Sequence, residues 1–207
     1  MIRVVTIERE YGSGGADIAK LLAERLEWKL WDQRLTDEIA RQLECDSGAV
    51  EERAERRDAL HYRLFKAFLR GSFEGSLNPR LKMVDADCIR EAAERVVTAA
   101  AQSGDSVIVG RGSAYYLHDR PDALHVFIYA PLEAKVHRLR AGGKSEGEAI
   151  ELAQTVDRDR SAYIKQYFDI DWPDREFFHL MINSTIGDEM VVQAILGSIA
   201  ALNQRSS

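Results

Sequence analysis

IRVVTIEREYGSGGADIAKLLAERL, residues 2–26, is the stretch that decides the fold. Its first part is apolar and β-branched, which predicts a buried strand. A glycine-rich turn follows at Gly12–Gly15, and apolar residues then recur at helical spacing. This order predicts an anion-binding unit, because such a turn aims backbone N–H groups inward and the helix adds the positive end of its dipole. Phosphate is the anion we expect, and glycines that serve packing alone are the alternative.

The turn matches the phosphate-binding motif G-x-x-x-x-G-K-S/T only in part. When Gly14 is aligned with the second glycine, Arg9 stands at the first glycine, Gly15 at the lysine and Ala16 at the hydroxyl position. The backbone can still cradle a phosphate. The lysine that reaches the β- and γ-phosphates and the hydroxyl that binds Mg²⁺ are both replaced.

Length, charge and cysteine content limit the classes of protein to consider. A chain of 207 residues with 45% hydrophobic residues predicts one α/β domain with an ordinary core. The net charge of −6 argues against a non-specific nucleic-acid binder. Cys45 and Cys88 lack C-x-x-C spacing and the histidines lack metal-ligand spacing, so we expect no metal site. Without a signal peptide or a membrane-length apolar run, we expect a cytoplasmic protein.

Strands and helices are predicted to alternate along the rest of the chain. The predicted strands are Glu27–Leu30, Val107–Val109, Leu124–Tyr129 and Leu180–Asn183. The predicted helices begin near Leu35 and then cover 45–70, 85–101, 132–141, about 146–167 and 189–202, with Ser145 as an N-cap.

Two side chains follow predicted strands, at the sheet edge where open α/β proteins bind ligands. Asp32 comes after the second strand, where ligand contact and capping of the next helix are equally open interpretations. Arg111 stands between Gly110 and Gly112, directly after a buried strand. A guanidinium group suits a planar anion such as phosphate or carboxylate, so we favour a binding role over a surface arginine in a turn.

Basic residues cluster on two predicted helices that a Gly142-Gly143 hinge connects: Arg138, Arg140, Arg158 and Arg160. This layout is typical of a lid that closes over phosphates and excludes water. Helices held by salt bridges are the alternative, with Asp157 and Asp159 neutralising their neighbours. The charged segment at about 45–82 is predicted to be a helical insertion that covers a substrate or contacts a second subunit in a homodimer.

The order of these blocks resembles nucleoside monophosphate kinases, and most closely the cytidylate kinase-like family of P-loop kinases. The blocks that carry the resemblance are R-E-Y-G-S-G-G at 9–15, W-D at 31–32, V-G-R-G at 109–112, D-R-D-R at 157–160 with Tyr163, and I-N-S at 182–184. The resemblance implies a three-layer α/β/α fold with a five-stranded parallel sheet, formed by residues 1–207 as a single domain. It also implies a substrate-binding insertion at about 45–82 and a lid at about 141–170.

The resemblance further implies ATP with Mg²⁺ as the phosphoryl donor and CMP or dCMP as the acceptor, with no nucleic acid or membrane as partner. By position, the donor phosphates would be held by Gly12, Ser13, Gly14 and Gly15. Arg111 and Asp32 would bind the acceptor, and Arg158 and Arg160 would contact phosphates from the lid. We therefore expect Arg158, Arg160 and Asp32 to be catalytic, and Arg9 to supply part of the missing positive charge.

Two departures from the family pattern leave a second function open. Cytidylate kinases carry lysine where Gly15 stands, and aspartate where Gly112 follows Arg111. The first change removes a charge from the phosphate site, and the second weakens the implication of a cytosine nucleotide. A non-catalytic module that binds a nucleotide or another anion is the alternative to a kinase.

Overall fold

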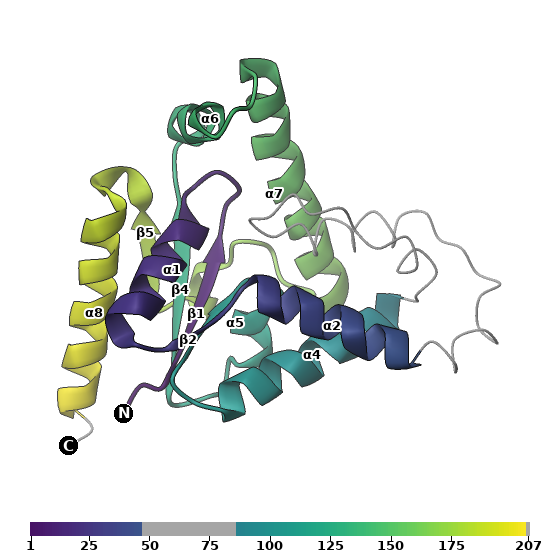
Figure 1. The fold of residues 1–207 in the computed structure, drawn as a ribbon, viewed down its shortest axis with the longest axis vertical. Helices are drawn as coiled ribbons and strands as arrows, with labels where there is room; N and C mark the ends of the chain where they lie inside the picture. The colour runs from purple at the N-terminus through teal and green to yellow at the C-terminus, as the bar shows by residue number, and fades with distance from the viewer. Residues whose placement is uncertain (47–85, 206–207) are drawn as a thin grey trace.

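The computed structural model of this chain describes residues 1–46 and 86–205 (Figure 1). Its centre is a five-stranded parallel sheet in the order β2-β3-β1-β4-β5, which confirms the predicted sheet. The strands are β1 (Val4–Arg9), β2 (Lys29–Trp31), β3 (Ser106–Val109), β4 (Ala123–Tyr129) and β5 (Leu180–Asn183). The order places β1, which leads into the glycine-rich turn, in the middle of the sheet.

Helices precede or follow each strand, as the alternating pattern predicts. The described α-helices are α1 (Gly15–Leu26), α2 (Gln33–Asp46), α4 (Ala86–Gln102), α5 (Ser113–Tyr116), α6 (Leu132–Ala141), α7 (Glu146–Phe168) and α8 (Asp188–Arg205). Two short 3₁₀ helices, η4 (Arg175–Phe177) and η5 (Ser184–Ile186), flank β5. Among residues 1–46 and 86–205, no helix has the length and apolarity that a membrane crossing requires.

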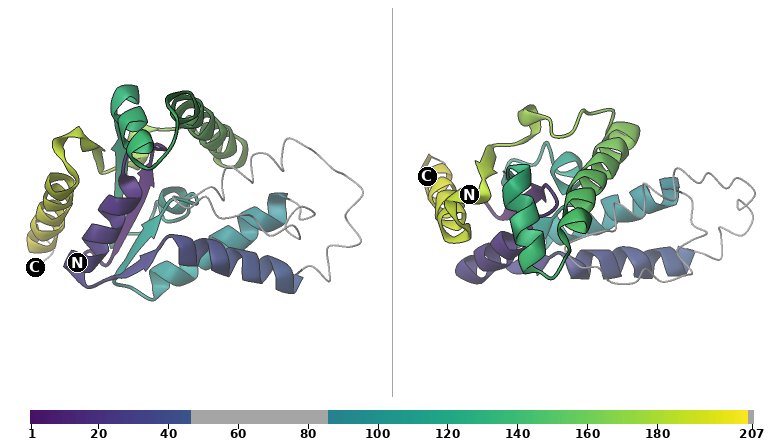
Figure 2. Two further views of the ribbon diagram at one scale, coloured as in Figure 1. Left: turned by 45° about the horizontal axis from the view of Figure 1, so that its top comes forward. Right: turned by 90° about the horizontal axis from the view of Figure 1, so that it is seen from above.

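The sheet has a hydrophobic cluster on each face, and together they make the predicted three layers. Val5 and Ile7 of β1 pack with α1 and α8 on one face, whereas Val4 packs with α2 and α4 on the other. This alternation follows from the two-residue period of a strand. Figure 2 shows α1 and α8 side by side, apart from α2 and α4. Strands covered on both faces are apolar throughout, as in β3.

The parallel register brings several strand ends to one edge of the sheet. Ile7 of β1 is level with Val109 of β3, and Arg9 is level with Ile128 of β4. The segments that leave these three strands therefore meet above the same edge. Helices α6 and α7 rise over this edge beside the glycine-rich turn (Figure 1), and they position the candidate site described below.

Several element boundaries differ from the prediction. The second strand begins at Lys29, because Glu27 takes a left-handed conformation (φ 56°) and ends α1. The short helix α5 was not predicted. The predicted N-cap is confirmed, since Ser145 Oγ accepts a hydrogen bond from Glu148 N at 3.3 Å. The predicted helix at 45–70 and most of the predicted insertion at 45–82 lie outside the described residues.

Candidate phosphate-binding site

The turn between β1 and α1 has the backbone of an anion cradle. Gly12 (φ 79°) and Gly14 (φ 82°) adopt left-handed conformations that glycine reaches without steric cost. The first intrahelical bond of α1 runs from Ile18 N to Gly14 O at 3.1 Å. The N–H groups at the start of α1, from Gly15 onward, therefore precede the hydrogen-bonded part of the helix and can bind an anion.

A cavity of about 730 Å³ lies against this turn. One side of the cavity is lined by residues 9–17, with the exception of Ser13. The other side is lined by residues of α6, of α7 and of the segment that connects these helices. The second side contributes three cationic residues, Arg138, Lys144 and Arg160. The cavity thus joins a backbone cradle to several positive side chains, a combination that suits a polyphosphate.

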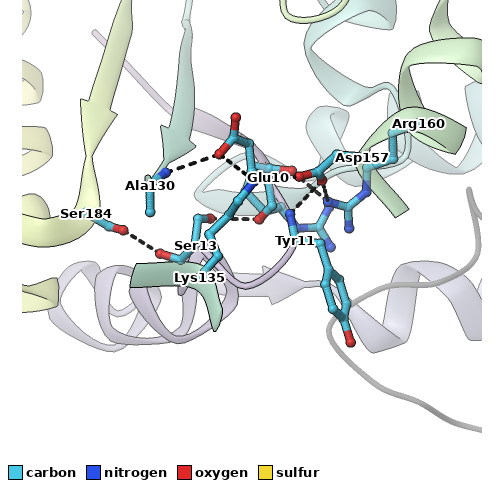
Figure 3. A network of polar contacts seen from close by, with 9 residues as sticks. Glu10, Tyr11, Ser13, Ala130, Lys135, Asp157, Arg160 and Ser184 are labelled. Carbon is cyan, nitrogen blue, oxygen red and sulfur yellow. Dashed lines mark hydrogen bonds and ion pairs between the residues drawn. The ribbon is translucent and has the colours of Figure 1, made fainter. Parts of the chain in front are cut away.

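A buried ion-pair network holds the turn to α6 and α7. Lys135 Nζ on α6 lies 3.2 Å from Glu10 Oε2 and 3.0 Å from Asp157 Oδ2 on α7 (Figure 3). Burial alone lowers the pKa of Lys135, but the two carboxylates outweigh it and hold that pKa above its usual value. Lys135 therefore stays charged and connects the turn to both helices.

Helix α7 also contacts the backbone of the turn directly. Asp157 Oδ1 accepts a hydrogen bond from Tyr11 N at 2.7 Å (Figure 3). Arg160 Nη1 donates a hydrogen bond to Arg9 O at 2.8 Å. Arg160 Nη1 lies 3.3 Å from Asp157 Oδ1 as well. The Asp157 carboxylate thus accepts the hydrogen bond of one backbone N–H group in the turn, that of Tyr11. The Arg160 guanidinium group donates to the backbone carbonyl oxygen of Arg9, two residues earlier.

Ser13 supports the turn from inside. Its hydroxyl donates to Glu10 O at 2.8 Å, and its carbonyl oxygen accepts from Ser184 Oγ at 2.6 Å (Figure 3). Glu10 Oε2 accepts from Ala130 N at 3.2 Å, so the turn is tied to the end of β4 too. The Ser13 side chain is fully buried and does not line the cavity. Its position fits a structural role for the hydroxyl.

Three arginines lie close together at the sheet edge: Arg9 and Arg111 are buried, and the Arg160 side chain is 11% exposed. Arg111 Nη2 donates to Thr36 Oγ1 at 2.7 Å, and Arg9 Nη2 lies 3.9 Å from Asp32 Oδ1. Burial and, after it, the positive charge of Arg9 lower the pKa of Arg111 to about 9 and that of Arg160 to about 10. Nearby carboxylates oppose these shifts: Asp32 for Arg111, Asp157 for Arg160, and Glu8 for both. The repulsion between the guanidinium groups is thus only partly offset, and a bound anion would relieve it further.

A model of the cytidylate kinase-like family matches residues 4–186 of this chain. The chain belongs to the cytidylate kinase-like family. A curated relative is the cytidylate kinase of Methanosarcina mazei, which is 26% identical over 183 residues, covering 87% of this chain and 86% of the relative. The family match spans the glycine-rich turn, the Arg111 segment and the helices that line the cavity.

Solved structures confirm the P-loop kinase fold of this family member. An uncharacterized protein from Eubacterium ventriosum has a TM-score of 0.69 and 23% identity, covering 97% of this chain and 99% of the other. Shikimate kinase from Bacteroides thetaiotaomicron has a TM-score of 0.55 and 13% identity, with coverage of 97% and 99%. Shikimate kinase from Acinetobacter baumannii, in complex with shikimate, has a TM-score of 0.54 and 18% identity, with coverage of 97% and 94%. These similarities show the fold alone.

The residues of the site fit the ATP and Mg²⁺ that membership of this family implies. The cradle and the surrounding cations suit a triphosphate. Within the described part of the chain, no three His, Cys, Asp or Glu side chains form a group that could hold a metal ion. In kinases, Mg²⁺ binds through nucleotide phosphates, water and one or two carboxylates. Asp32 lies 3.9 Å from Arg9, and the carboxylates of Glu10 and Asp17 belong to residues that line the cavity itself.

The structure brings most of the predicted site residues together. Arg9, Gly12, Gly14, Gly15 and Arg160 all line the cavity. Asp32 and Arg111 lie beyond Arg9, at the ends of β2 and β3.

Arg158 and Ser13 are predicted site residues that do not line the cavity. Ser13 is buried beneath the turn, as described above. The Arg158 side chain is exposed on α7. Two other basic residues predicted for the lid form ion pairs. Arg140 Nη1 lies 3.4 Å from Glu146 Oε2. Arg138 forms a bidentate pair with Asp188, in which both hydrogen bonds are 3.0 Å long. The lid role of residues 141–170 remains a prediction.

Sequence reasoning missed the ion-pair network of Glu10, Lys135 and Asp157. Glu10 lies in the block at 9–15, whose glycines are the recognisable part of the motif. Lys135 lies on α6 and Asp157 on α7, and the Gly142-Gly143 turn joins these two helices. This turn was the one sequence signal that the two side chains could face each other. Lys144 also lines the cavity, and sequence reasoning missed it as well. It follows Gly142-Gly143, in the connection between α6 and α7.

Proposed function

We propose that this protein is an ATP-dependent phosphotransferase. It transfers the γ-phosphoryl group of ATP to CMP, dCMP or another small acceptor. The observation that carries this proposal is the convergence of Arg9, Arg111 and Arg160 above a glycine-rich turn at the carboxyl edge of a parallel sheet. Phosphoryl transfer asks a protein mainly to position the reactants and to neutralise the oxygens of the transferred group, and buried guanidinium groups do both.

The donor side of the site is the cavity at the turn. Backbone N–H groups of Gly12–Ala16 and the side chains of Arg138, Lys144 and Arg160 are the groups that would hold the triphosphate. Mg²⁺ bound with ATP supplies further neutralisation of the phosphate charge. Helix α7 contacts Tyr11 N and Arg9 O on this side, and in the proposed kinase it would help to exclude water.

The acceptor side lies at the ends of β2 and β3. The fork of Arg111 suits the phosphate or carboxylate of the acceptor, and Thr36 orients that fork through its hydroxyl. Asp32 would orient the acceptor or, through water, Mg²⁺. In the transfer, the attacking oxygen of the acceptor forms a bond to the γ-phosphorus while the bond from that phosphorus to the bridging oxygen of ADP breaks. The similarity to the cytidylate kinase of Methanosarcina mazei supports a cytosine nucleotide as the acceptor.

One observation favours a binding module without turnover as the second candidate. The carboxylate of Asp157 already occupies Tyr11 N, where a phosphate oxygen could otherwise bind. A protein that senses an anion by exchange with Asp157 needs no acceptor site. The buried Arg111 at the end of β3 favours the kinase instead, because it lies beyond the donor cavity.

An assay of ADP release coupled to NADH oxidation separates the two functions. The protein is incubated with ATP and Mg²⁺ and with CMP, dCMP, UMP, AMP, GMP or small anionic metabolites in turn. Acceptor-dependent ADP release, with CMP or dCMP among the best acceptors, is the expected result. If no acceptor increases ADP release while ATP still raises the melting temperature, the kinase proposal is wrong and the binding module is correct.

A further inference from the structure

Arg9 and Gly15 occupy one shared volume beside the phosphate cradle. A Cβ atom placed on Gly15 would lie 2.6 Å from Arg9 Cβ and 2.8 Å from Arg9 Cγ, closer than real side chains approach. The Cβ of Arg9 is fixed by the backbone of β1, so it has little freedom to withdraw. Gly15 itself has an ordinary helical backbone that any residue could adopt. Glycine is therefore needed at position 15 because of the stem of Arg9.

This steric relation connects the two main departures from the phosphate-binding motif. The motif has a glycine at position 9 and a lysine at position 15. This chain has an arginine at position 9 and a glycine at position 15. Both sequences place one long cationic side chain in the shared volume. In the motif it comes from position 15, at the start of α1, and in this chain it comes from position 9, at the end of β1. The missing lysine and the additional arginine are thus a single exchange.

The guanidinium group of Arg9 extends from the cradle toward the acceptor side. Its Nη1 lies against Gly110, so closely that a Cβ atom on Gly110 would collide with it. Its Nη2 lies 3.9 Å from Asp32 Oδ1 and has no hydrogen-bond acceptor among residues 1–46 and 86–205. The Arg9 side chain is only 5% exposed, yet Arg9 contributes to the cavity wall. A buried donor without an acceptor is costly, and an anion at this point would satisfy it.

We propose that Arg9 replaces the lysine of the P-loop as the cation that binds the terminal phosphate of the nucleotide. This inference rests on the proposed function, because it assigns the donor to the cavity at the turn. A guanidinium fork anchored on β1 reaches from Gly15 to Asp32 and so lies between the donor and acceptor sides. It can contact the phosphoryl group from the side of the sheet, with a rigid, planar set of donors.

The test measures nucleotide binding, which does not depend on turnover. Titration calorimetry with ATP, ADP and AMP, each with Mg²⁺, is performed on the wild type, Arg9→Gln and the exchange variant Arg9→Gly/Gly15→Lys. Arg25→Ala is the control, because it removes an exposed arginine at the far end of α1. Arg9→Gln keeps most of the stem and removes the charge. We expect it to weaken ATP binding by about tenfold or more and AMP binding by less than about threefold.

The exchange variant tests the coupling itself. Gly15→Lys alone is expected to lower the melting temperature, because its Cβ collides with Arg9. With Arg9→Gly added, both the melting temperature and ATP binding are expected to recover, the latter to within about threefold of the wild type.

Specific results would overturn the inference. A folded Arg9→Gln that binds ATP as tightly as the wild type would show that Arg9 does not bind the terminal phosphate. So would an exchange variant that melts like the wild type but binds ATP no better than Arg9→Gln. If Arg9-dependent ATP binding is found without ADP release for any acceptor, the kinase function fails and this inference stands. A wild type that does not bind ATP would remove both.

Discussion

The carboxylate of Asp157, in the middle of α7, accepts the backbone N–H of Tyr11 at 2.7 Å and also lies 3.0 Å from Lys135 Nζ. One side chain therefore connects three segments that are far apart in sequence. This relationship fixes the position of α7 above the phosphate cradle. It also leaves a buried lysine that depends on Asp157 for most of its compensation.

Replacing Asp157 is expected to destabilise the protein and to disorganise the turn. In Asp157→Ala, Lys135 keeps only Glu10 as a partner and Tyr11 N loses its acceptor. We expect the free energy of unfolding to fall by about 3–5 kcal/mol, the range for breaking a buried pair by removing one partner. Urea denaturation measures this change. Asp171→Ala, which removes an exposed partner of Lys165, is the control and should change stability little. Equal losses in the two variants would contradict the proposed role of Asp157.

Arg111 is expected to determine the affinity for the acceptor. Arg111→Ala should raise the KM of the acceptor by about tenfold or more and change the KM of ATP little, because Arg111 lies beyond the donor cavity. Arg111→Lys should recover only part of the loss, since an ammonium group lacks the fork. Steady-state kinetics with both substrates varied provides the measurement. Arg120→Ala, which removes a pair with Asp122 near the start of β4, is the control. An increase in the KM of ATP alone would place Arg111 on the donor side.

Arg160 and Arg158 are expected to differ, although the sequence predicts a catalytic role for both. Arg160 lines the cavity and donates to Arg9 O at 2.8 Å, whereas Arg158 is exposed on the same helix. Arg160→Ala should lower kcat by about tenfold or more, and Arg158→Ala by less than about threefold. A comparison of kcat at saturating substrate tests this order. A larger loss in Arg158→Ala would mean that α7 turns that residue inward during turnover.

His125 is expected to make stability depend on pH in the mildly acidic range. It is buried on β4, and its Nδ1 shares a hydrogen bond with Thr6 Oγ1 at 2.7 Å. Burial, together with the neighbouring His179 and His118, lowers the pKa of His125 to about 4. The folded state therefore prefers the neutral ring, and the unfolded state binds the extra proton between about pH 6.5 and pH 4. Stability is full above pH 6.5 and declines as the pH falls through this window.

The loss from His125 should amount to about 3 kcal/mol at most by pH 4. Thermal unfolding between pH 4 and pH 7.5 measures it, with His125→Gln as the comparison because glutamine does not titrate. The wild type should lose more stability than His125→Gln over this range. Parallel pH profiles for the two proteins would show that His125 does not titrate as expected.

Local patterns were sufficient to predict the parallel sheet. Buried strands such as β3 are continuous apolar runs, and they are bounded by glycine or charge. The loop-forming glycines and Arg111 could be placed at the carboxyl edge, because every parallel strand ends there. The short helix α5 could not be predicted, since four residues are too few for a periodic signal.

The contacts that complete the site depend on packing that no local pattern contains. The stem of Arg9 covers Gly15 only after the turn has brought the end of β1 against the start of α1. The Lys135–Asp157 pair requires that α6 and α7 fold back on each other at Gly142-Gly143. Arg158 and Arg160 are two residues apart in the sequence, and only the rotation of α7 about its axis decides which of them lines the cavity.

The shared volume of Arg9 and Gly15 restricts how such a loop can evolve. Arginine at position 9 and lysine at position 15 collide, so a lineage cannot gain one cation before it gives up the other. A path of single substitutions between the two loops must pass through glycine at both positions, a form with neither cation. Strong epistasis between these two sites follows from the collision, and each form of the loop would persist once it was established.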